Sequence, residues 1–466
     1  MNAPAKILPS RIAEIVGTAN LICDDEELAA YEVDGMLPGA AARPGTSEEV
    51  AELARFAAAE KLAIFACGAR TKLSMGMPPE RYDLAVDMTR MNRIAAYDPG
   101  DLTLGVEAGI GLAQVAKELE EHGQFLPLAV PWTAATTVGG TIASGVDSPL
   151  RQFYGTARDY VLGMEFVTGE GVLTKSGGRV VKNVTGYDLH KLMIGALGTL
   201  GIITRVNFKT FPLPHASRGF LAAFATAEAA LGMRRSVSRS AVPLLTLEIL
   251  SPELAKIFAT RSPTTLGVAL EEPGAWFPQD KWIVAAAYGG TERVLERCES
   301  ELKKIAAECA AEDVAVLGDN RRPKVWGRLR ECFAMLQECS PATTIFKISA
   351  LPAEVQRFLP ELKRAAEACQ LAHATLVRGV GIIYFALLPE ESRDEAMERL
   401  ELAARDIFDR CTALGASAII PWCPLELKKR VNIWGAPRAD FALMQKVKQV
   451  FDPRGLFSPG RFAGGL

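Results

Sequence analysis

A glycine-rich loop is the pattern in this 466-residue chain that most clearly could bind a ligand. It covers residues 136–145, reads TTVGGTIASG, and leads into a segment of small residues. Glycine lets the backbone approach an anion closely, and successive backbone N–H groups can form a concave anion site. The loop is therefore a candidate pyrophosphate site, and the alternative is a tight structural turn.

Several other kinds of site are excluded by spacing. The loop is not a Walker motif because no Gly-Lys-Ser/Thr follows it, and Gly109-Ile110-Gly111 lacks the third glycine of a dinucleotide-binding fingerprint. The nine cysteines contain no Cys-x-x-Cys pair, so a zinc site or an iron–sulfur cluster is not expected within the chain. The four histidines are too far apart to share one helical turn.

Further blocks follow the loop in a fixed order. They read RDYVLG at 158–163, GGRVVKNVTGYDL at 177–189 and GALGTLGIIT at 195–204, and the tail reads FDP at 451–453 and SPGRF at 458–462. Together these blocks resemble the flavoprotein family of vanillyl-alcohol oxidase and p-cresol methylhydroxylase. The segment 181–188 is most similar to the FAD-binding subunits of glycolate oxidases. The resemblance is strong over residues 40–214, weak in the middle of the chain, and clear again in the tail.

The resemblance implies FAD, with its pyrophosphate held between a first loop at 68–76 and a second loop at 136–145. It implies that backbone near Ile202 and Ile203 meets the adenine end, and that Asn183, Gly186 and Tyr187 lie toward the isoalloxazine. The implied cofactor-binding residues are Gly68, Ala69, Arg70, Thr71, Lys72, Pro131, Thr136, Thr137, Gly139, Gly140, Thr141, Ala143, Ser144, Asn183, Gly186, Tyr187, Gly198, Gly201, Ile202 and Ile203.

The first loop departs from the family pattern, which has three glycines before a Ser/Thr and a Lys. Ala69 and Arg70 stand where glycines are usual, and both side chains disfavour positive φ. Either the loop differs in shape, or Arg70 adds a charged contact to the pyrophosphate. The loop contains no histidine, and Cys67 is interpreted as a core thiol at the end of a strand. We therefore expect non-covalent FAD.

The resemblance also implies a 2-hydroxy acid substrate. In related dehydrogenases a cap strand carries a lysine before a Ser-Leu-Pro-like ending, which makes Lys347 the candidate for binding the substrate carboxylate. The alternative for Lys347 is a solvated lysine at a strand edge. Relatives carry a metal-binding His-x-Gly-Asp-Gly-Asn-x-His motif, but Val377 and Tyr384 occupy its histidine positions here. We expect no catalytic metal. Arg378 and Tyr384 are candidate replacements, although a packed cap sheet would explain both.

The elements that must position these residues change in character along the chain. Up to residue 213, short apolar strands alternate with amphipathic helices; Thr46 and Glu49 form a capping-box pattern before one of them. Strands are expected at 62–67, 102–106, 160–168 and 201–211, and later at 219–224, 245–250, 282–288, 345–351 and 381–388. The predicted fold is α+β. It comprises a two-subdomain FAD-binding domain of the p-cresol methylhydroxylase type (1–213), a ferredoxin-like antiparallel cap with helices on one face (214–420), and a C-terminal segment that returns to the FAD domain (421–466).

Composition limits the partners. The formal net charge is −3, so no positive field would attract nucleic acid, and no apolar run is long enough to span a membrane. A cytoplasmic protein is expected, either free or held at the inner face of a membrane by partners. The predicted function is the FAD-binding subunit of a glycolate-like 2-hydroxy acid oxidase or dehydrogenase. Electrons would then pass to a paralogous FAD subunit and an iron–sulfur subunit. The alternative is a non-catalytic flavin-carrying subunit whose paralogous partner oxidises the substrate.

Overall fold

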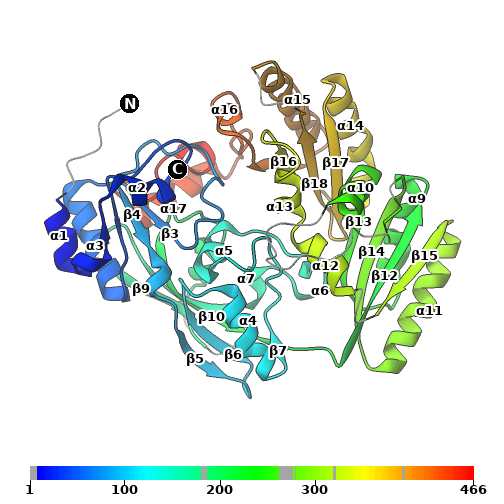
Figure 1. Cartoon of the computed structure of the whole chain (residues 1–466), viewed down its shortest axis with the longest axis horizontal. Coiled ribbons are helices and arrows are strands. Elements are labelled where there is room, and N and C mark those ends of the chain that lie inside the picture. The colour runs from blue at the N-terminus through cyan, green and yellow to red at the C-terminus, as the bar shows by residue number, and fades with distance from the viewer. Residues whose placement is uncertain (1–7, 180–185, 262–276, 279, 319–321, 391–393) are drawn as a thin grey trace.

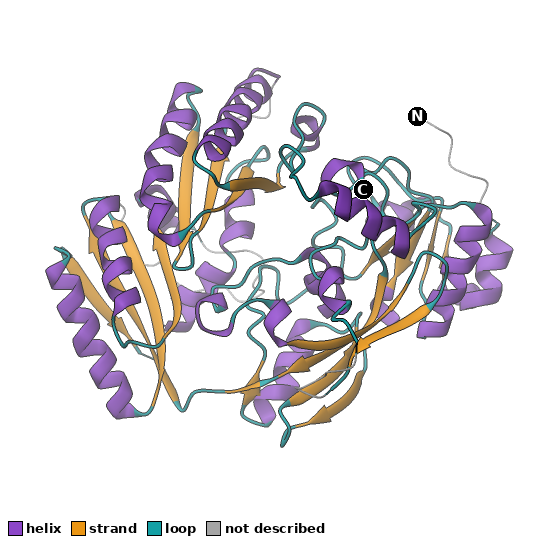
Figure 2. Ribbon diagram, turned by 180° about the vertical axis from the view of Figure 1, so that it is seen from behind, coloured by secondary structure: helices purple, strands orange, loops and turns teal. Residues whose placement is uncertain are grey.

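The computed structural model describes residues 8–179, 186–261, 277–278, 280–318, 322–390 and 394–466. Two small sheets and their helices form one side of the molecule, and one large sheet with its helices forms the other (Figure 1). The view from behind shows the same two bodies, joined by loops and short helices that lie between them (Figure 2). The mixture of helices and antiparallel sheets confirms the predicted α+β class.

The first sheet has four strands in the order β1-β2-β4-β3. Strand β4 pairs in parallel with both β2 and β3, whereas β1 is antiparallel to β2. Parallel strands need crossover connections, and the segment between β2 and β3 supplies one as a long helix. The elements of this part are α1 (Pro9–Val16), β1 (Leu21–Ile22), α2 (Asp25–Leu28), β2 (Ala40–Ala42), α3 (Ser47–Glu60), β3 (Ile64–Cys67) and β4 (Leu84–Asp87).

Helix α3 begins where the capping pattern predicts. The Thr46 hydroxyl accepts a hydrogen bond from the Glu49 backbone N–H at 3.1 Å. The Glu49 carboxylate accepts from the N–H of Gly45 at 2.7 Å, one residue earlier than a complete capping box would require. Val50 and Leu53 lie on the buried face of the helix, against the first sheet. The predicted amphipathic helix is therefore confirmed, with a modified cap.

The second sheet has five antiparallel strands in the order β5-β6-β10-β8-β9. Most of the glycine-rich segment forms a helix, which begins at Val138 and packs against the central strand β10. Two short strands, β7 and β11, pair separately and lead the chain toward the large sheet. The elements are β5 (Ile94–Asp98), β6 (Thr103–Glu107), α4 (Leu112–Glu121), β7 (Gln124–Phe125), α5 (Val138–Ser144), α6 (Arg151–Tyr154), α7 (Ala157–Tyr160), β8 (Val161–Val167), β9 (Leu173–Gly177), α8 (His190–Met193), β10 (Ile202–Lys209) and β11 (Phe211–Pro212).

The third sheet has eight antiparallel strands in the order β15-β12-β14-β13-β17-β18-β16-β19. Strands β16, β17 and β18 carry the predicted catalytic residues, and they are neighbours in the sheet. The strands are β12 (Ala216–Phe224), β13 (Leu244–Leu250), β14 (Trp282–Gly290), β15 (Asp313–Leu317), β16 (Thr344–Ser349), β17 (Ala372–Arg378), β18 (Ile382–Leu388) and β19 (Ser417–Trp422).

Helices cover both faces of this sheet, which corrects the prediction of helices on one face. The long helices α9 (Ala227–Arg239), α11 (Glu292–Glu308), α14 (Val355–Ala368) and α15 (Asp394–Ala413) pack on one face, around Phe220, Phe346 and Phe385. The shorter helices α10 (Pro252–Thr260), α12 (Arg322–Arg330) and α13 (Cys332–Gln337) share a second core with Leu221 and Tyr384. Successive strand residues point to opposite faces, so nearly continuous apolar strands require cover on both sides.

The C-terminal segment runs from the core of the large sheet, where Leu427 packs, back to the first sheet, where Phe457 packs. It contains α16 (Leu425–Lys428) and α17 (Phe441–Phe451), and a parallel bridge pairs Phe457 with Ile64 of β3. The buried Lys448 ammonium donates to the Asp452 carboxylate at 2.7 Å and to the Thr199 carbonyl at 2.8 Å. The domain limits 1–213, 214–420 and 421–466 remain a proposal. Among the helices of the described residues, none is long and apolar enough to cross a membrane. Short 3-10 helices occur at Thr18–Asn20, Ala29–Tyr31, Met88–Arg90, Pro352–Glu354 and Ala463–Gly465.

Candidate cofactor and substrate site

The first predicted loop follows β3 and meets the second loop directly. A Cβ atom on Gly68 would lie 2.1 Å from the Thr137 hydroxyl oxygen, so a side chain at this position would push the loops apart. Arg70 adopts φ +61°, in the region that favours glycine. Its guanidinium lies 3.2 Å from the Asp87 carboxylate and stacks 4.6 Å from the Tyr31 ring centroid. The loop thus keeps a glycine-like shape at Arg70, and local contacts hold that side chain.

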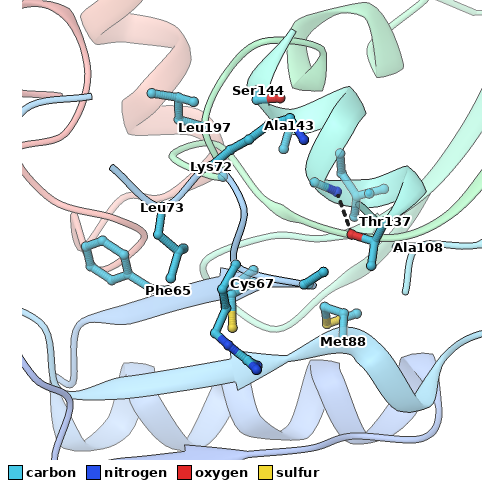
Figure 3. Close-up of a pocket in the computed structure, with 18 of the residues that line it drawn as sticks. Phe65, Cys67, Lys72, Leu73, Met88, Ala108, Thr137, Ala143, Ser144 and Leu197 are labelled. Carbon is cyan, nitrogen blue, oxygen red and sulfur yellow. Dashed lines mark hydrogen bonds between the residues drawn. The ribbon is translucent and has the colours of Figure 1, made fainter. Parts of the chain in front are cut away.

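The second loop leads into α5. The Thr137 hydroxyl accepts a hydrogen bond from the Gly140 N–H at 3.3 Å, the contact drawn as a dashed line in Figure 3. A Cβ atom on Gly139 would lie 2.9 Å from the Ala108 carbonyl oxygen, which accepts the Gly139 N–H at 2.7 Å. Gly139 therefore allows α5 to pack tightly against Ala108, at the end of β6. This close packing leaves the start of α5 facing the first loop.

Lys72 is a buried cation between the loops. Its ammonium contacts the Thr136 hydroxyl and lies 3.2 Å from the Thr71 hydroxyl. Burial lowers the pKa of Lys72 to about 8, although Glu331 opposes the shift. Among the described carboxylates, none lies within 4.0 Å of this ammonium. A buried ammonium without a paired carboxylate is favourable where an anion binds, and a pyrophosphate is such an anion.

The two loops form the walls of a pocket that opens to solvent (Figure 3). Most of the predicted cofactor-binding residues line it. These are Gly68, Ala69, Arg70, Thr71, Lys72, Thr136, Thr137, Gly139, Gly140, Ala143, Ser144, Gly198, Gly201 and Ile203. A concave site with glycine walls and a buried cation fits the pyrophosphate region of FAD.

Several predicted residues lie elsewhere. Ile202 faces the core of the first sheet, because β10 alternates its side chains and Ile203 takes the pocket side. Thr141 is buried within α5 and donates to the Thr137 carbonyl at 2.9 Å. Pro131 does not line the pocket. Gly186 and Tyr187 are exposed, with Tyr187 at 89%, and Asn183 lies outside the described residues. The structure therefore does not place these residues in the pocket.

Other pocket residues were missed from the sequence. They are Phe65, Ala66, Cys67, Leu73, Met88, Ala108, Leu197, Ser458 and Arg461. Arg461 is buried, donates to the carbonyls of Leu73 and Met75, and lies 3.7 Å from the Asp34 carboxylate. Burial lowers its pKa to about 10. The tail block SPGRF was the available signal: the C-terminal segment was expected to return to the FAD domain, but nothing in the pattern assigned Arg461 to the first loop.

A second pocket adjoins the first. The two pockets share Ser144 and Leu197. The second pocket lies between the glycine-rich loop and the large sheet, and we call it the cleft. Its walls include Asp147, Lys347 and Tyr384 together with the rings of Trp422, Trp434 and Phe462. The cofactor pocket therefore adjoins the cleft that two of the three predicted catalytic residues, Lys347 and Tyr384, line.

Charged side chains from different parts of the chain meet behind the cleft. The Arg378 guanidinium lies 2.8 Å from the Glu248 carboxylate and 3.6 Å from that of Asp147, and all three side chains are almost fully buried. Glu248 and Arg378 are directly paired across β13 and β17. Burial raises the pKa of Glu248 to about 7, although Arg378 opposes the shift. Arg378 is thus engaged by two carboxylates and does not line the cleft itself.

Lys347 and Tyr384 lie directly opposite each other on β16 and β18. Burial lowers the pKa of Lys347, while Asp147 opposes this effect. Burial and the Asp147 charge raise the pKa of Tyr384 well above its ordinary value. Lys347 is not a solvated strand-edge lysine, because β16 lies between β18 and β19 and the side chain points into the cleft. Both residues can therefore donate hydrogen bonds to a ligand there.

Val377 and Tyr384, which stand where relatives have metal-binding histidines, lie on the paired strands β17 and β18. Val377 is fully buried in the core between the sheet and the long helices α9, α11, α14 and α15. The described residues contain no group of three His, Cys, Asp or Glu side chains able to hold a metal ion. The prediction that no catalytic metal is used stays a prediction.

These features define a two-loop flavoprotein in which a cap sheet closes over the end of the cofactor pocket. Residues 38–177 match the family model described as FAD binding domain, and residues 213–418 with 434–462 match FAD linked oxidases, C-terminal domain. The second model covers about half of the chain. The chain therefore belongs to the FAD-linked oxidases: it binds FAD and is an oxidoreductase.

Relatives extend this comparison. The chain is 25% identical over 480 residues to glycolate oxidase subunit GlcD of Bacillus subtilis, covering 98% of this chain and 96% of the relative. It is 37% identical over 172 residues to glycolate oxidase subunit GlcE of Escherichia coli, covering 37% and 49%. A structure of p-cresol methylhydroxylase superposes with a TM-score of 0.78 at 17% identity, covering 98% of each chain. The last comparison confirms the predicted fold.

Proposed function

We propose that the chain oxidises a small 2-hydroxy acid at the cleft and passes the electrons to a partner subunit. The observation that carries this proposal is Lys347, a partly buried cation that lines a pocket adjoining the cofactor pocket. An ammonium in a partly apolar pocket favours a carboxylate. The similarity to a glycolate oxidase subunit supports the same substrate class.

Each cleft residue then has a distinct role. Lys347 binds the substrate carboxylate, and the Tyr384 hydroxyl donates a hydrogen bond to a substrate oxygen. Arg378 acts indirectly, because Glu248 and Asp147 hold its guanidinium behind the cleft. Trp422, Trp434 and Phe462 exclude water from the apolar side. FAD supplies the oxidising power, since it accepts a hydride from the carbon that bears the hydroxyl group.

The test is anaerobic titration of the purified flavoprotein with glycolate, D-lactate and D-2-hydroxyglutarate. We expect at least one acid to bleach the visible flavin band of the wild type. In Lys347→Met, half-maximal bleaching should require a much higher concentration of that acid. Lys363→Met is the matched control, because Lys363 is 59% exposed on α14, which packs on the other face of the sheet. Bleaching of Lys347→Met that saturates like the wild type would reject the role of Lys347. No bleaching of the wild type by any of these acids would reject the substrate class.

A second candidate is a flavin-carrying subunit whose partner performs the oxidation. The chain is similar to two different glycolate oxidase subunits, GlcD over 98% of its length and GlcE over 37%, and this leaves open which subunit performs the oxidation. Electrons would still leave through another subunit, and we propose that an iron–sulfur protein receives them. Comparing turnover of the isolated chain with turnover after remixing with co-purified subunits separates the two candidates. Full turnover by the isolated chain with an artificial acceptor would reject the carrier role.

A further inference from the structure

The cleft needs a base for the hydroxyl proton, and the three predicted catalytic residues do not supply one. Lys347 is assigned to the carboxylate, and the Arg378 guanidinium remains protonated in proteins. Tyr384 remains a neutral phenol at physiological pH, because burial and the nearby Asp147 charge raise its pKa. A base must therefore come from another residue on the cleft wall.

Asp147 lies on the cleft wall at a position where a base could act. It follows α5 in the loop that leads to α6, and its side chain is 3% exposed. One carboxylate oxygen lies 3.2 Å from the Arg151 guanidinium, 3.5 Å from the Tyr384 hydroxyl and 3.6 Å from the Arg378 guanidinium. The other accepts the Ser148 N–H at 3.2 Å. Asp147 thus links the segment after the glycine-rich loop to Tyr384 and Arg378 of the large sheet.

The surroundings of the cleft narrow the choice of base. The cleft adjoins a further pocket beside Arg151, and both pockets include Asp147 and Lys347 in their walls. Among the described residues that line either pocket, Asp147 is the single carboxylate, and no histidine is present. Glu248 lines neither pocket. Among these lining residues, Asp147 is therefore the one that both lies near Lys347 and Tyr384 and can accept a proton.

We propose that Asp147 is the catalytic base that accepts the hydroxyl proton of a 2-hydroxy acid whose carboxylate is bound by Lys347. This inference rests on the proposed function. The substrate O–H bond breaks and its proton moves to the Asp147 carboxylate. The C–H bond on the same carbon breaks, and that hydrogen leaves with both electrons to FAD, the oxidant. The carbon becomes a carbonyl, so the product is a 2-oxo acid and the flavin is reduced by two electrons.

The charges around Asp147 favour the required protonation state. Burial acts to raise its pKa, but Arg378 on β17, Lys347 on β16 and Arg151 on α6 together bring it below the ordinary value. Tyr384 on β18 donates toward the carboxylate, and Glu248 on β13 lies on the far side of Arg378. The carboxylate is therefore ionised before substrate arrives. The alternative is a purely structural role, in which Asp147 ties the loop to the cap sheet.

The test compares wild type, Asp147→Asn and Asp147→Glu as holoproteins. We measure FAD content, reduction by dithionite, binding of oxalate from the flavin spectrum, and the anaerobic rate of bleaching by the best acid. Oxalate carries carboxylates but no C–H bond, so it reports binding without reaction. Asp313→Asn, at the start of β15, is the matched control because its carboxylate is hydrogen-bonded within its own exposed strand end.

For Asp147→Asn we expect normal FAD content, normal reduction by dithionite and oxalate binding within about threefold, with bleaching slowed by about 10²–10⁴. Asp147→Glu should recover part of that rate, and Asp313→Asn should match the wild type. The wild-type rate should fall as pH drops through the Asp147 pKa, and the residual Asn rate should lose this dependence.

Three outcomes overturn the assignment. Bleaching of Asp147→Asn at the wild-type rate rejects Asp147 alone and leaves the proposed substrate class intact. Joint loss of FAD and oxalate binding in both Asn and Glu variants shows a structural role. A wild type that neither bleaches with the acids nor binds oxalate rejects the proposed function, and the base assignment fails with it.

Discussion

Gly68 and Thr137 bring the two cofactor loops together: a methyl group on Gly68 would lie 2.1 Å from the Thr137 hydroxyl oxygen. Contacts this close cannot be accommodated without movement of one loop. Gly68→Ala should therefore weaken FAD binding at least about tenfold, an effect of about 1.4 kcal/mol. Titration of the apoprotein with FAD, followed by flavin fluorescence, measures the change.

Gly232→Ala is the control for this substitution. Gly232 lies within helix α9, and an added Cβ atom would meet only the end of the Arg235 side chain at 3.8 Å. Its FAD affinity should equal that of the wild type. Equal affinity of Gly68→Ala and Gly232→Ala would show that the loops separate without consequence for the cofactor.

FAD affinity should depend on pH through Lys72. Burial lowers the pKa of Lys72 to about 8 in the free protein, and anion binding favours the charged ammonium. Affinity should therefore be constant well below pH 8 and should fall as pH rises through about 8. Lys72→Met should bind FAD more weakly at neutral pH, and its affinity should no longer change over this range. A wild-type profile that persists in Lys72→Met would assign the titration to another group.

The flavin should be bound without a covalent link. Cys67 is a thiol on the pocket wall, and burial raises its pKa well above the ordinary value, so the nucleophilic thiolate is disfavoured. Acid precipitation should release all flavin into the supernatant, where its absorbance is measured. Cys67→Ala should retain the same flavin content. Yellow colour that stays with the denatured wild-type pellet, but not with the Cys67→Ala pellet, would contradict this expectation.

Removing one partner of the buried Arg378–Glu248 ion pair should destabilise the protein more than replacing both partners. Arg378→Met leaves the Glu248 carboxylate buried without its 2.8 Å partner, and we expect a loss of about 3–5 kcal/mol of stability. The double variant with Glu248→Leu should recover much of that loss. Unfolding of the apoproteins in urea measures both values. Equal destabilisation in the single and double variants would show that Arg378 stabilises the protein through Asp147 instead.

The cofactor half of the site was largely predictable because its determinants are local in the sequence. Gly139 and Gly140 are recognised as backbone positions that permit close approach, and Lys72 lies within the first loop itself. The face of a strand was harder to predict. Ile202 and Ile203 are equally apolar, and β10 is covered on both sides, so composition could not indicate which residue faces the pocket.

The sequence by itself determined the flavoprotein class, the two loops and the alternation of strands and helices, since these depend on short-range patterns. Only the tertiary structure decided the composition of the cleft. The sheet brings Lys347 opposite Tyr384, and the glycine-rich loop brings Asp147 to a tyrosine 237 positions later in the chain. Arg461 reaches the cofactor pocket in the same way, from the C-terminal tail to the first loop. Such contacts depend on strand order and on how two separately formed cores pack together, and no local periodicity encodes either of them.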